Sequence, residues 1–255
     1  MNRAELVETW LREELQPFSG WDFSYLDGRM DSGREHWSYL GRAAELMQCS
    51  SSVIDMDTGG GEQLLRLRRH WPARVFATED YLPNFELATE RLSGLGVRVV
   101  RAAVADAAPM PFADGEFDLV LNRHAAFNSG EVARVLSESG VFLTQQVHGM
   151  WAWDLMAAFD VSPQFPDAAL TKYVPKLKAA GLEINAAEEW EGRLTFTDVG
   201  AIVYYLKAIP WEVPGFTVNT HLPYLLALQQ RLEAGEELGF YAAKYLIEAT
   251  KGSGS

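Results

Sequence analysis

The sequence is poor in cysteine, in long hydrophobic runs and in basic residues. Cys49 is the only cysteine among 255 residues, so an internal disulfide and a cysteine-based zinc cluster are both excluded. No apolar run approaches the roughly 20 residues that a membrane-spanning helix needs. Lysine and arginine number 22 against 35 aspartates and glutamates, and the formal net charge of −13 disfavours nucleic acid as a substrate or partner.

These absences favour a soluble, cytoplasmic protein. The N-terminal segment alternates charged with apolar side chains and lacks the apolar core of a secretory signal. The single cysteine suits a reducing compartment, and Cys49 is expected to be buried and inert. One basic stretch is interpreted as a solvated helix face, and it consists of Arg66, Arg68, Arg69 and His70.

Short apolar segments alternate with amphipathic ones through the middle of the chain. Ser52–Asp57 is predicted to be a buried strand, Thr58–Gly61 a turn and Glu62–Trp71 a helix. The unit repeats, with further strands predicted at 74–79, 97–101, 117–122 and 140–147. Strands that alternate with helices form right-handed crossovers. The predicted fold is therefore α/β, a Rossmann-like three-layer sandwich with a mostly parallel sheet of about seven strands and helices on both faces.

The segments on either side of this core are expected to complete the sheet and cap it. A helix near 171–180, a strand from Leu182 to Trp190, helices at 198–207 and 222–232, and a closing strand at 239–249 are predicted. We expect one domain over residues 1–251. It comprises an N-terminal helical and aromatic cap (1–50), a cofactor-binding core (52–148) and a lid with closing strands (149–251), followed by a linker-like tail (252–255).

Acidic residues lie where the first three predicted strands of the core end. Asp55 and Asp57 close the first strand, Glu79 closes the second, and Asp106 follows the third. Ligands of open parallel sheets bind beyond these carboxyl ends, beside the first glycine turn. A carboxylate after the second strand can accept both hydroxyls of a ribose, and an acidic residue after the third can accept from an adenine amino group. The arrangement predicts a nucleoside site. NAD fits less well, because Leu64 stands where a third, small residue is wanted.

Several motifs in the same order resemble those of the class I S-adenosylmethionine-dependent methyltransferases. The segment Asp55-Met-Asp-Thr-Gly-Gly-Gly61 is similar to the family's acidic and glycine-rich motif, and 106–124 and 131–140 resemble its following segments. The resemblance covers about Ser52 to Val147 and suggests a bacterial branch of the family. It implies that S-adenosylmethionine is the cofactor, that Gly59 and Gly61 border its methionine part, that Glu79 takes the ribose, and that Asp106 and Ala107 read the adenine. The complete predicted cofactor set is Asp55, Asp57, Thr58, Gly59, Gly61, Glu79, Asp80, Asp106, Ala107 and Asn122.

Two positions depart from the family pattern. Asp57 stands where the first glycine is usual, and Ser139 replaces one of the paired glycines before the fifth strand. The Asp57 side chain either obstructs the methionine part of the cofactor and repels its carboxylate, or accepts a hydrogen bond from its α-amino group. Both alternatives remain open at this point.

Two histidines and several aromatic residues are candidates for the chemistry. His124, at the end of the fourth strand, is the first candidate for a general base, and His148, past the fifth strand, is the second. Each has a structural alternative as a hydrogen-bonded framework residue. Five aromatic side chains are predicted to bind substrate or shield the sulfonium, namely Trp21, Tyr25, Trp37, Trp151 and Trp211. Acidic residues show no ligand spacing with a histidine, so no metal site is expected.

The leading hypothesis is an S-adenosylmethionine-dependent O- or N-methyltransferase that acts on a small molecule. The alternative is a relative that keeps the fold without methylating, either as a binding protein or as another kind of catalyst, and it is motivated by Asp57. A third hypothesis, an RNA methyltransferase, requires a basic surface that the composition does not indicate. The oligomeric state and the acceptor are left open.

Overall fold

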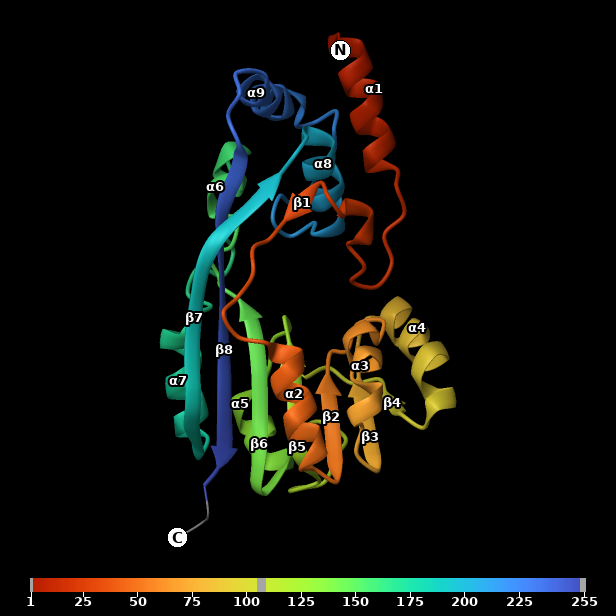
Figure 1. Cartoon of the computed structure of the whole chain (residues 1–255), viewed down its shortest axis with the longest axis vertical. Helices are drawn as coiled ribbons and strands as arrows, with labels where there is room; N and C mark the ends of the chain where they lie inside the picture. Colours follow the sequence, from red (N-terminus) through yellow and green to blue (C-terminus); the bar gives the residue numbers. More distant parts are fainter. Residues whose placement is uncertain (1, 105–108, 253–255) are drawn as a thin grey trace.

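A single eight-stranded sheet organises the chain. The computed structural model describes residues 2–104 and 109–252. Its strand order is β1-β7-β8-β6-β5-β2-β3-β4 (Figure 1). Five strands run parallel, namely β2 (Ser52–Met56), β3 (Arg74–Thr78), β4 (Arg98–Val100), β5 (Phe117–Arg123) and β6 (Leu136–Val147). Three are antiparallel to their neighbours, namely β8 (Leu238–Lys251), β7 (Leu182–Phe196) and β1 (Met30–Asp31). The predicted α/β fold with a mostly parallel sheet is confirmed.

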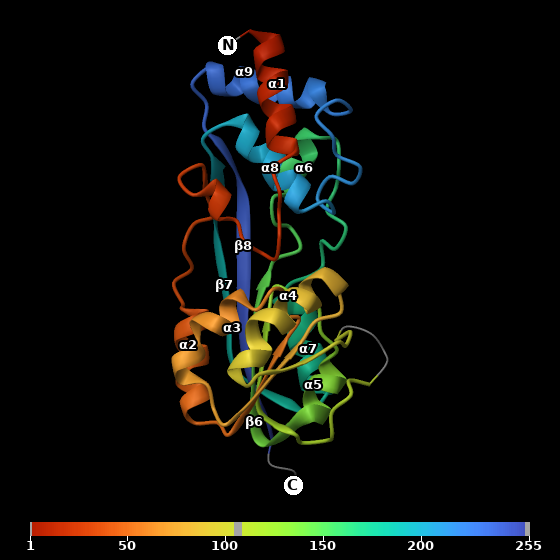
Figure 2. The ribbon, with the colours of Figure 1, turned by 90° about the vertical axis from the view of Figure 1, so that its right-hand side faces the viewer.

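Helices cover both faces of the parallel strands, as Figure 2 shows edge-on. One face packs against α2 (Tyr39–Gln48), α3 (Glu62–Arg66) and α4 (Leu82–Leu92), the other against α5 (Ser129–Val135) and α7 (Leu170–Ala179). Short 3₁₀ turns follow α3 and α4, at η2 (Arg68–His70) and η3 (Ser93–Leu95). Every residue of β2 is buried, because helices cover both faces of the sheet at this strand. A strand of this kind appears in the sequence as a continuous apolar run.

The remaining helices form a second layer beyond the carboxyl ends of the parallel strands. Strands β7 and β8 are long enough to run from the core into this upper part of the molecule (Figure 1). There they meet η1 (Ser24–Leu26), α1 (Arg3–Glu14), α6 (Trp153–Ala158), α8 (Val199–Ala208) and α9 (Leu222–Glu233). Helix α8 is buried almost all round and forms the centre of a third apolar cluster. We call this upper part the cap.

The cap and the core exchange segments along the sequence. The first helix belongs to the cap, but α2 lies on the sheet, where Ala43 and Met47 are buried against the core. Cys49 follows the last buried position of α2 and is exposed, so the expectation that it would be buried is wrong. No helix in the described ranges is both long and apolar enough to cross a membrane.

Candidate cofactor and active site

The turn after β2 has the backbone shape that a glycine-rich loop requires. Asp57, Gly59 and Gly61 all have positive φ, of 51°, 63° and 82°. The Thr58 amide donates to the carbonyl of Thr78 over 2.9 Å, which ties the turn to β3. A Cβ on Gly61 would lie 2.8 Å from Cδ1 of Leu92, so only glycine lets α3 approach α4 this closely. Asp57 therefore occupies a conformation that glycine adopts without strain and that an L side chain adopts at a cost.

Glu79 is held rigidly beside this turn. The side chain is buried, at 6% exposure. Its Oε2 accepts from the Gly59 amide and its Oε1 from the Tyr81 amide, both over 2.9 Å. Burial raises the pKa of Glu79, against the opposing effect of these amide donors. Each carboxylate oxygen keeps a second lone pair, so the group can still accept hydroxyl donors from a ligand.

Three carboxylates, those of Asp55, Asp57 and Glu79, lie close together at the carboxyl ends of β2 and β3. Burial raises the pKa of Asp55 to about 6, although the Thr58 hydroxyl donates to it over 2.6 Å. Burial, and then the charge of Glu79, raises the pKa of Asp57 to about 7. The charge of Arg123 offsets part of this rise at Asp55, whereas the charges that act on Asp57 are all negative. This edge is therefore suited to a ligand that brings hydroxyl donors and a cation.

An aromatic loop from the cap lies across the glycine turn. Cδ1 of Trp21 is so close that a Cβ on Gly59 would lie 2.5 Å from it. Trp21 meets Trp211 from the opposite side of the cap at 5.8 Å between ring centroids. Both rings remain about half exposed, at 45% and 49%. Two of the predicted aromatic residues thus lie together over the predicted cofactor turn.

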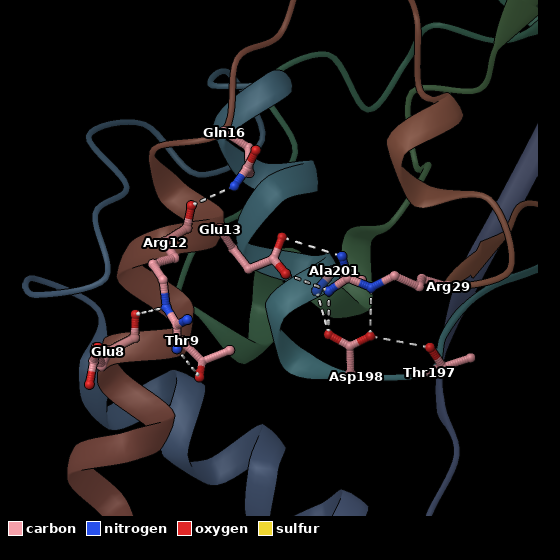
Figure 3. A network of polar contacts seen from close by, with 9 residues as sticks. All are labelled: Glu8, Thr9, Arg12, Glu13, Gln16, Arg29, Thr197, Asp198 and Ala201. Carbon is pink, nitrogen blue, oxygen red and sulfur yellow. Dashed lines mark hydrogen bonds and ion pairs between the residues drawn. The ribbon is translucent and has the colours of Figure 1, made fainter.

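Within the cap, a network of ion pairs attaches the segment that follows Trp21 to α1 and α8 (Figure 3). Arg29 donates to both carboxylate oxygens of Asp198, at 2.9 and 2.7 Å, and to Glu13 at 2.9 Å. Asp198 also caps the first turn of α8 by accepting from the Ala201 amide over 2.8 Å. The bidentate contact joins the segment preceding β1 to the N-terminus of α8. The loop between α1 and β1 is therefore fixed at both ends.

The ends of β5 and β6 carry polar residues on both faces of the sheet. His124 follows β5 with a φ of 56°, and its ring contacts Gln145, with 3.1 Å between the His124 Nε2 and Gln145 Nε2 atoms. The indole of Trp37 donates to Oε1 of Gln145 over 2.8 Å. The surrounding protein, and then the charges of Arg123 and Lys244, lower the pKa of His124 well below its usual value. His124 is nevertheless exposed as a residue, and its partner Gln145 lines a recess at the ends of β5 and β6.

Asn122 lies on the opposite face from this recess. Its Oδ1 accepts from Thr144 over 2.9 Å and from Gln146 over 2.5 Å. The Nδ2 atom of Asn122 is buried and has no hydrogen-bond partner among the residues that the structure describes. Successive strand residues alternate between faces, which separates Asn122 from His124's partner Gln145. Its predicted role as a cofactor ligand stays a prediction.

The other predicted residues are distributed unevenly around the site. Asp80 is exposed next to Glu79, whereas Asp106 and Ala107 lie outside the described residues. Nδ1 of His148 accepts from the Met150 amide over 3.0 Å, which is a turn-forming contact. The remaining aromatics pack within the cap, where the indole of Trp151 donates to Tyr205 over 2.9 Å and Tyr25 lies 4.6 Å from Tyr204 between ring centroids.

Three site features were not anticipated from the sequence. Arg123 and Tyr39 border the recess, and a buried Glu212 lies in the cap. Arg123 is a charged residue at the carboxyl end of a predicted strand whose centre, 119–121, is apolar, and this place at the strand end is a signal in the sequence. Tyr39 and Glu212 sit among apolar neighbours in sequence, and nothing in those patterns distinguishes them from core residues. In the part of the chain that the structure describes, no group of acidic, histidine or cysteine side chains could hold a metal ion.

Comparison with known proteins also indicates a methyltransferase domain. Residues 54–144 match the family described as methyltransferase domain, whereas a search of curated proteins found no match. The YcgJ protein of Bacillus subtilis superposes with a TM-score of 0.60 at 18% identity, covering 85% of this chain and 99% of that one. A candidate methyltransferase of Bacillus halodurans gives 0.59 at 18%, covering 84% and 100%. The [4+2]-cyclase SpnF gives 0.51 at 16%, covering 84% and 82%.

The fold and the edge residues together define a class of protein. A parallel sheet with a glycine turn after its first core strand and a buried carboxylate after the next is an arrangement that nucleoside-binding α/β domains share. The matched segment spans β2 to β6 and contains that turn, that carboxylate and His124. Residues 54–144 therefore match a methyltransferase domain, in agreement with the predicted resemblance to the class I family and with the prediction of a methyltransferase-type enzyme.

Proposed function

We propose that the protein transfers a methyl group from S-adenosylmethionine to an oxygen or nitrogen atom of a small molecule. The observation that carries this proposal is the arrangement of Glu79, whose carboxylate is fixed by the Gly59 and Tyr81 amides next to the glycine turn. A small acceptor is supported by the net charge of −13, which opposes nucleic acid. It is also supported by the aromatic cap over the turn.

The residues present fit this cofactor in their chemistry. A ribose supplies two neighbouring hydroxyl donors, which match the free lone pairs of Glu79. The α-amino group and the sulfonium would supply positive charge beside Asp57, whose pKa is raised by burial and by neighbouring carboxylates. Trp21 lies with Cδ1 of its indole beside Gly59, and an indole next to this turn would suit a cation. When bound, S-adenosylmethionine supplies an activated methyl group.

The protein's own contribution would be to position the acceptor and to remove its proton. Transfer of a methyl group is an in-line displacement, so alignment of donor and acceptor supplies much of the rate. A hydroxyl or protonated amine acceptor also needs a base. His124 is neutral and accessible, and its contact with Gln145 orients the ring. We assign it the role of general base, with Trp21 and Trp211 excluding water from above.

Calorimetric titration with S-adenosylhomocysteine, the demethylated product, tests the cofactor. We expect saturable binding to the wild-type protein. Glu79→Gln should weaken binding by roughly tenfold to a hundredfold, because hydrogen bonds to a charged group are lost. Glu86→Gln, at an exposed position on α4, is the matched control and should bind as the wild type does. If the wild-type protein binds neither S-adenosylhomocysteine nor S-adenosylmethionine, the proposal is wrong.

A second candidate function is a different reaction on the same fold. SpnF, a [4+2]-cyclase, shares this fold, so the fold does not by itself determine methyl transfer. Asp57 favours this candidate, because its carboxylate stands where glycine would leave space for the cofactor. Incubation of the protein with labelled S-adenosylmethionine and a panel of phenols and amines distinguishes the two. Cofactor binding without methyl transfer to any acceptor would favour the second candidate.

A further inference from the structure

One edge of the sheet ends in a long strand with little beyond it. Strand β7 pairs with β8 along its whole length, with one register shift at 184–186. On its other side β7 meets only β1, which pairs with Thr195 and Phe196. In the part of the chain that the structure describes, no strand lies beside the outer side of β7 from Leu182 to Leu194 (Figure 1). The backbone of this stretch can therefore pair with a further strand.

Alternate residues of this open edge direct their backbone groups away from the sheet. The Thr197 amide donates to the Arg29 carbonyl over 2.9 Å, so the backbone groups of Thr197 point toward β1. Every second residue of an antiparallel strand points the same way. Odd-numbered positions above the register shift therefore present their amides and carbonyls to the open edge. These residues are Ala187, Glu189, Glu191 and Arg193.

Hydrogen bonds on β8 agree with this alternation. Arg193 stands opposite Tyr241 in the register, and Glu191 stands opposite Ala243. The carbonyls of Tyr241 and Ala243 accept from amides in the segment 148–152, on the side away from β7. The residues opposite them consequently make no ladder hydrogen bonds to β8 and point outward.

The open edge is acidic on one face of the sheet. Four glutamates and one arginine lie within 183–193. Glu189 and Glu191 share the exposed face of β7, where Glu191 accepts from the Tyr241 hydroxyl over 2.9 Å. Burial, the hydrogen bond to Glu191 and the charges of both glutamates raise the pKa of Tyr241 to about 12. Neither glutamate has an ion-pair partner in the described ranges, so the charge of both is available to a ligand.

Cations around this face have partners of their own. Arg193 pairs with Glu237 at 3.3 Å. On α7, the ammonium groups of Lys172 and Lys176 lie over the ring of Tyr173, at 5.7 and 5.9 Å from its centroid. The two exposed carboxylates therefore determine the charge that this face presents to a partner.

The opposite face of β7 is less acidic. Its Glu188 pairs with His36 at 2.8 Å. Trp190 is half-buried there, and a Cβ on Gly33 would lie 2.6 Å from its ring. The segment that carries Gly33 also carries Arg34, which is exposed. A partner strand would place its cations on the face of the two exposed glutamates and apolar side chains beside Trp190.

A second copy of the chain fits this edge poorly. Two antiparallel copies of β7 that pair through their outward residues can be centred on Glu189, Trp190 or Glu191. Each of these registers places a glutamate directly opposite a glutamate of the other copy, and like charges in that position are destabilising. The same charges attract a strand that bears lysine or arginine.

We propose that residues 186–193 of β7 form a docking edge for an extended segment of a partner protein that carries lysine or arginine at every second position. The segment adds to the sheet antiparallel to β7, as β1 does further along the strand. Its main chain bonds to the outward amides and carbonyls, which supplies affinity, and its cations lie opposite Glu189 and Glu191, which supplies specificity. Docking here requires no methyl transfer and no bound cofactor.

Model peptides test the docking edge on the full-length protein. The probe is a peptide of seven residues, alternately lysine and valine, blocked at both ends and labelled for fluorescence anisotropy. We expect saturable binding in the micromolar to millimolar range, and no binding of the same peptide with glutamate in place of lysine. N-methylation of the lysine amides, which would face β7, should weaken binding by about tenfold or more. N-methylation of the valine amides, on the outer edge of the peptide, is the matched control and should change binding little.

Paired variants of the protein test the charge. Glu189→Lys combined with Glu191→Lys should weaken binding of the lysine peptide by about tenfold or more and allow the glutamate peptide to bind. Glu86→Lys combined with Glu90→Lys reverses two exposed charges on α4, and this control should bind the lysine peptide within about twofold of the wild type. Melting temperatures show whether both paired variants are folded.

Amide hydrogen exchange measures strand addition on the wild-type protein, without any variant. In the free protein the amides of Trp190 and Gly192 bond to β8 and should exchange slowly, whereas those of Glu189, Glu191 and Arg193 should exchange faster. The bound lysine peptide should slow the exchange of these three outward amides by about tenfold or more and leave the other two unchanged.

The proposal is overturned by a lysine peptide that does not bind at millimolar concentration, by equal binding of the two methylated peptides, or by equal losses in the β7 and α4 variants. If the outward amides become protected when the protein alone is concentrated, a second copy takes the edge, and the proposed partner is wrong. All these readouts are independent of S-adenosylhomocysteine binding, so failure of the proposed function would leave them unchanged.

Discussion

Replacement of Asp57 should stabilise the protein in a pH-dependent manner. Its pKa rises from 3.8 to about 7 in the folded protein, so the folded state holds a proton that the unfolded chain releases. Stability attributable to this proton is fully present below about pH 4 and is lost as the pH rises through about 7. At about 1.4 kcal/mol per pKa unit, the ceiling is about 4 kcal/mol at pH 8. Partial exposure and coupling to Glu79 reduce the expected value to about 1–3 kcal/mol.

Two substitutions separate the charge from the backbone strain. Asp57→Asn removes the charge and retains a side chain that tolerates positive φ. Asp57→Gly removes both the charge and the strain of the 51° φ, and the further gain should be under about 1 kcal/mol at every pH. Urea unfolding at pH 4.5 and pH 8 measures both terms, with Glu86→Gln as the control. An advantage of Asp57→Asn that is equal at the two pH values would refute the reasoning.

The same variants decide what Asp57 does for the cofactor. Since the neighbouring carboxylates leave this edge short of positive charge, we expect the Asp57 carboxylate to accept from the α-amino group of a bound ligand. Asp57→Gly should then weaken S-adenosylhomocysteine by roughly 1 kcal/mol or more at pH 8, with a smaller effect at pH 6, where the wild-type side chain is protonated. Tighter binding by the variant at pH 8 would show that the carboxylate obstructs the site.

Three further predictions concern the cap and the base. Trp21→Leu should weaken S-adenosylmethionine more than S-adenosylhomocysteine, by about threefold to thirtyfold, because only the former carries a sulfonium for the indole face; equal losses in calorimetry would argue against this contact. His124→Gln should lower kcat by about 10²–10⁴-fold without changing S-adenosylhomocysteine affinity. Because the pKa of His124 is held well below 6.5, the wild-type rate should stay level as the pH is lowered to 6.5. An inflection of the rate at or above pH 6.5 would contradict the role of His124 as the base. Burial raises the pKa of Glu212 to about 8. Relative to Glu212→Gln, the free energy of unfolding of the wild type should therefore fall between about pH 4.5 and pH 8, by up to a few kcal/mol. A difference in melting temperature between the two proteins that stays constant across that range would count against this.

Local patterns predicted the core of the fold because each core strand is buried on both faces. β2, β3 and β5 are short apolar runs between turn residues, and the structure places them within a residue or two of the predicted bounds. β1 consists of two residues and leaves no periodic signal. β6 begins at Leu136, whereas a start at Gly140 was predicted. The strand continues through Ser139 at a φ of 63°, a conformation that residue identity does not reveal.

The site was predicted in part, and the missing part depends on distant pairings. Glu79 and Gly59 follow from their places at strand ends, and the structure joins them by a hydrogen bond. The meeting of Trp21 with Trp211 depends on how distant segments pack within the cap. That of Tyr39 with Arg123 depends on how α2 packs on the sheet. Periodicity reports which face of an element is buried, but it carries no information on which distant element covers it.

Backbone strain and crowded charges occur together at the carboxyl ends of the parallel strands. Asp57 and His124 follow two paired strands, with Met56 beside Asn122 in the ladder, and both have positive φ without being glycine. The carboxyl ends of the same strands hold the crowded carboxylates of Asp55 and Asp57. Strain and unpaired charge persist only where the surrounding fold over-determines them, and they gather where a ligand binds. A ligand that carries hydroxyls and a cation would relieve the electrostatic cost of the crowded carboxylates, so its binding should raise the melting temperature of the wild type more than that of Asp57→Gly.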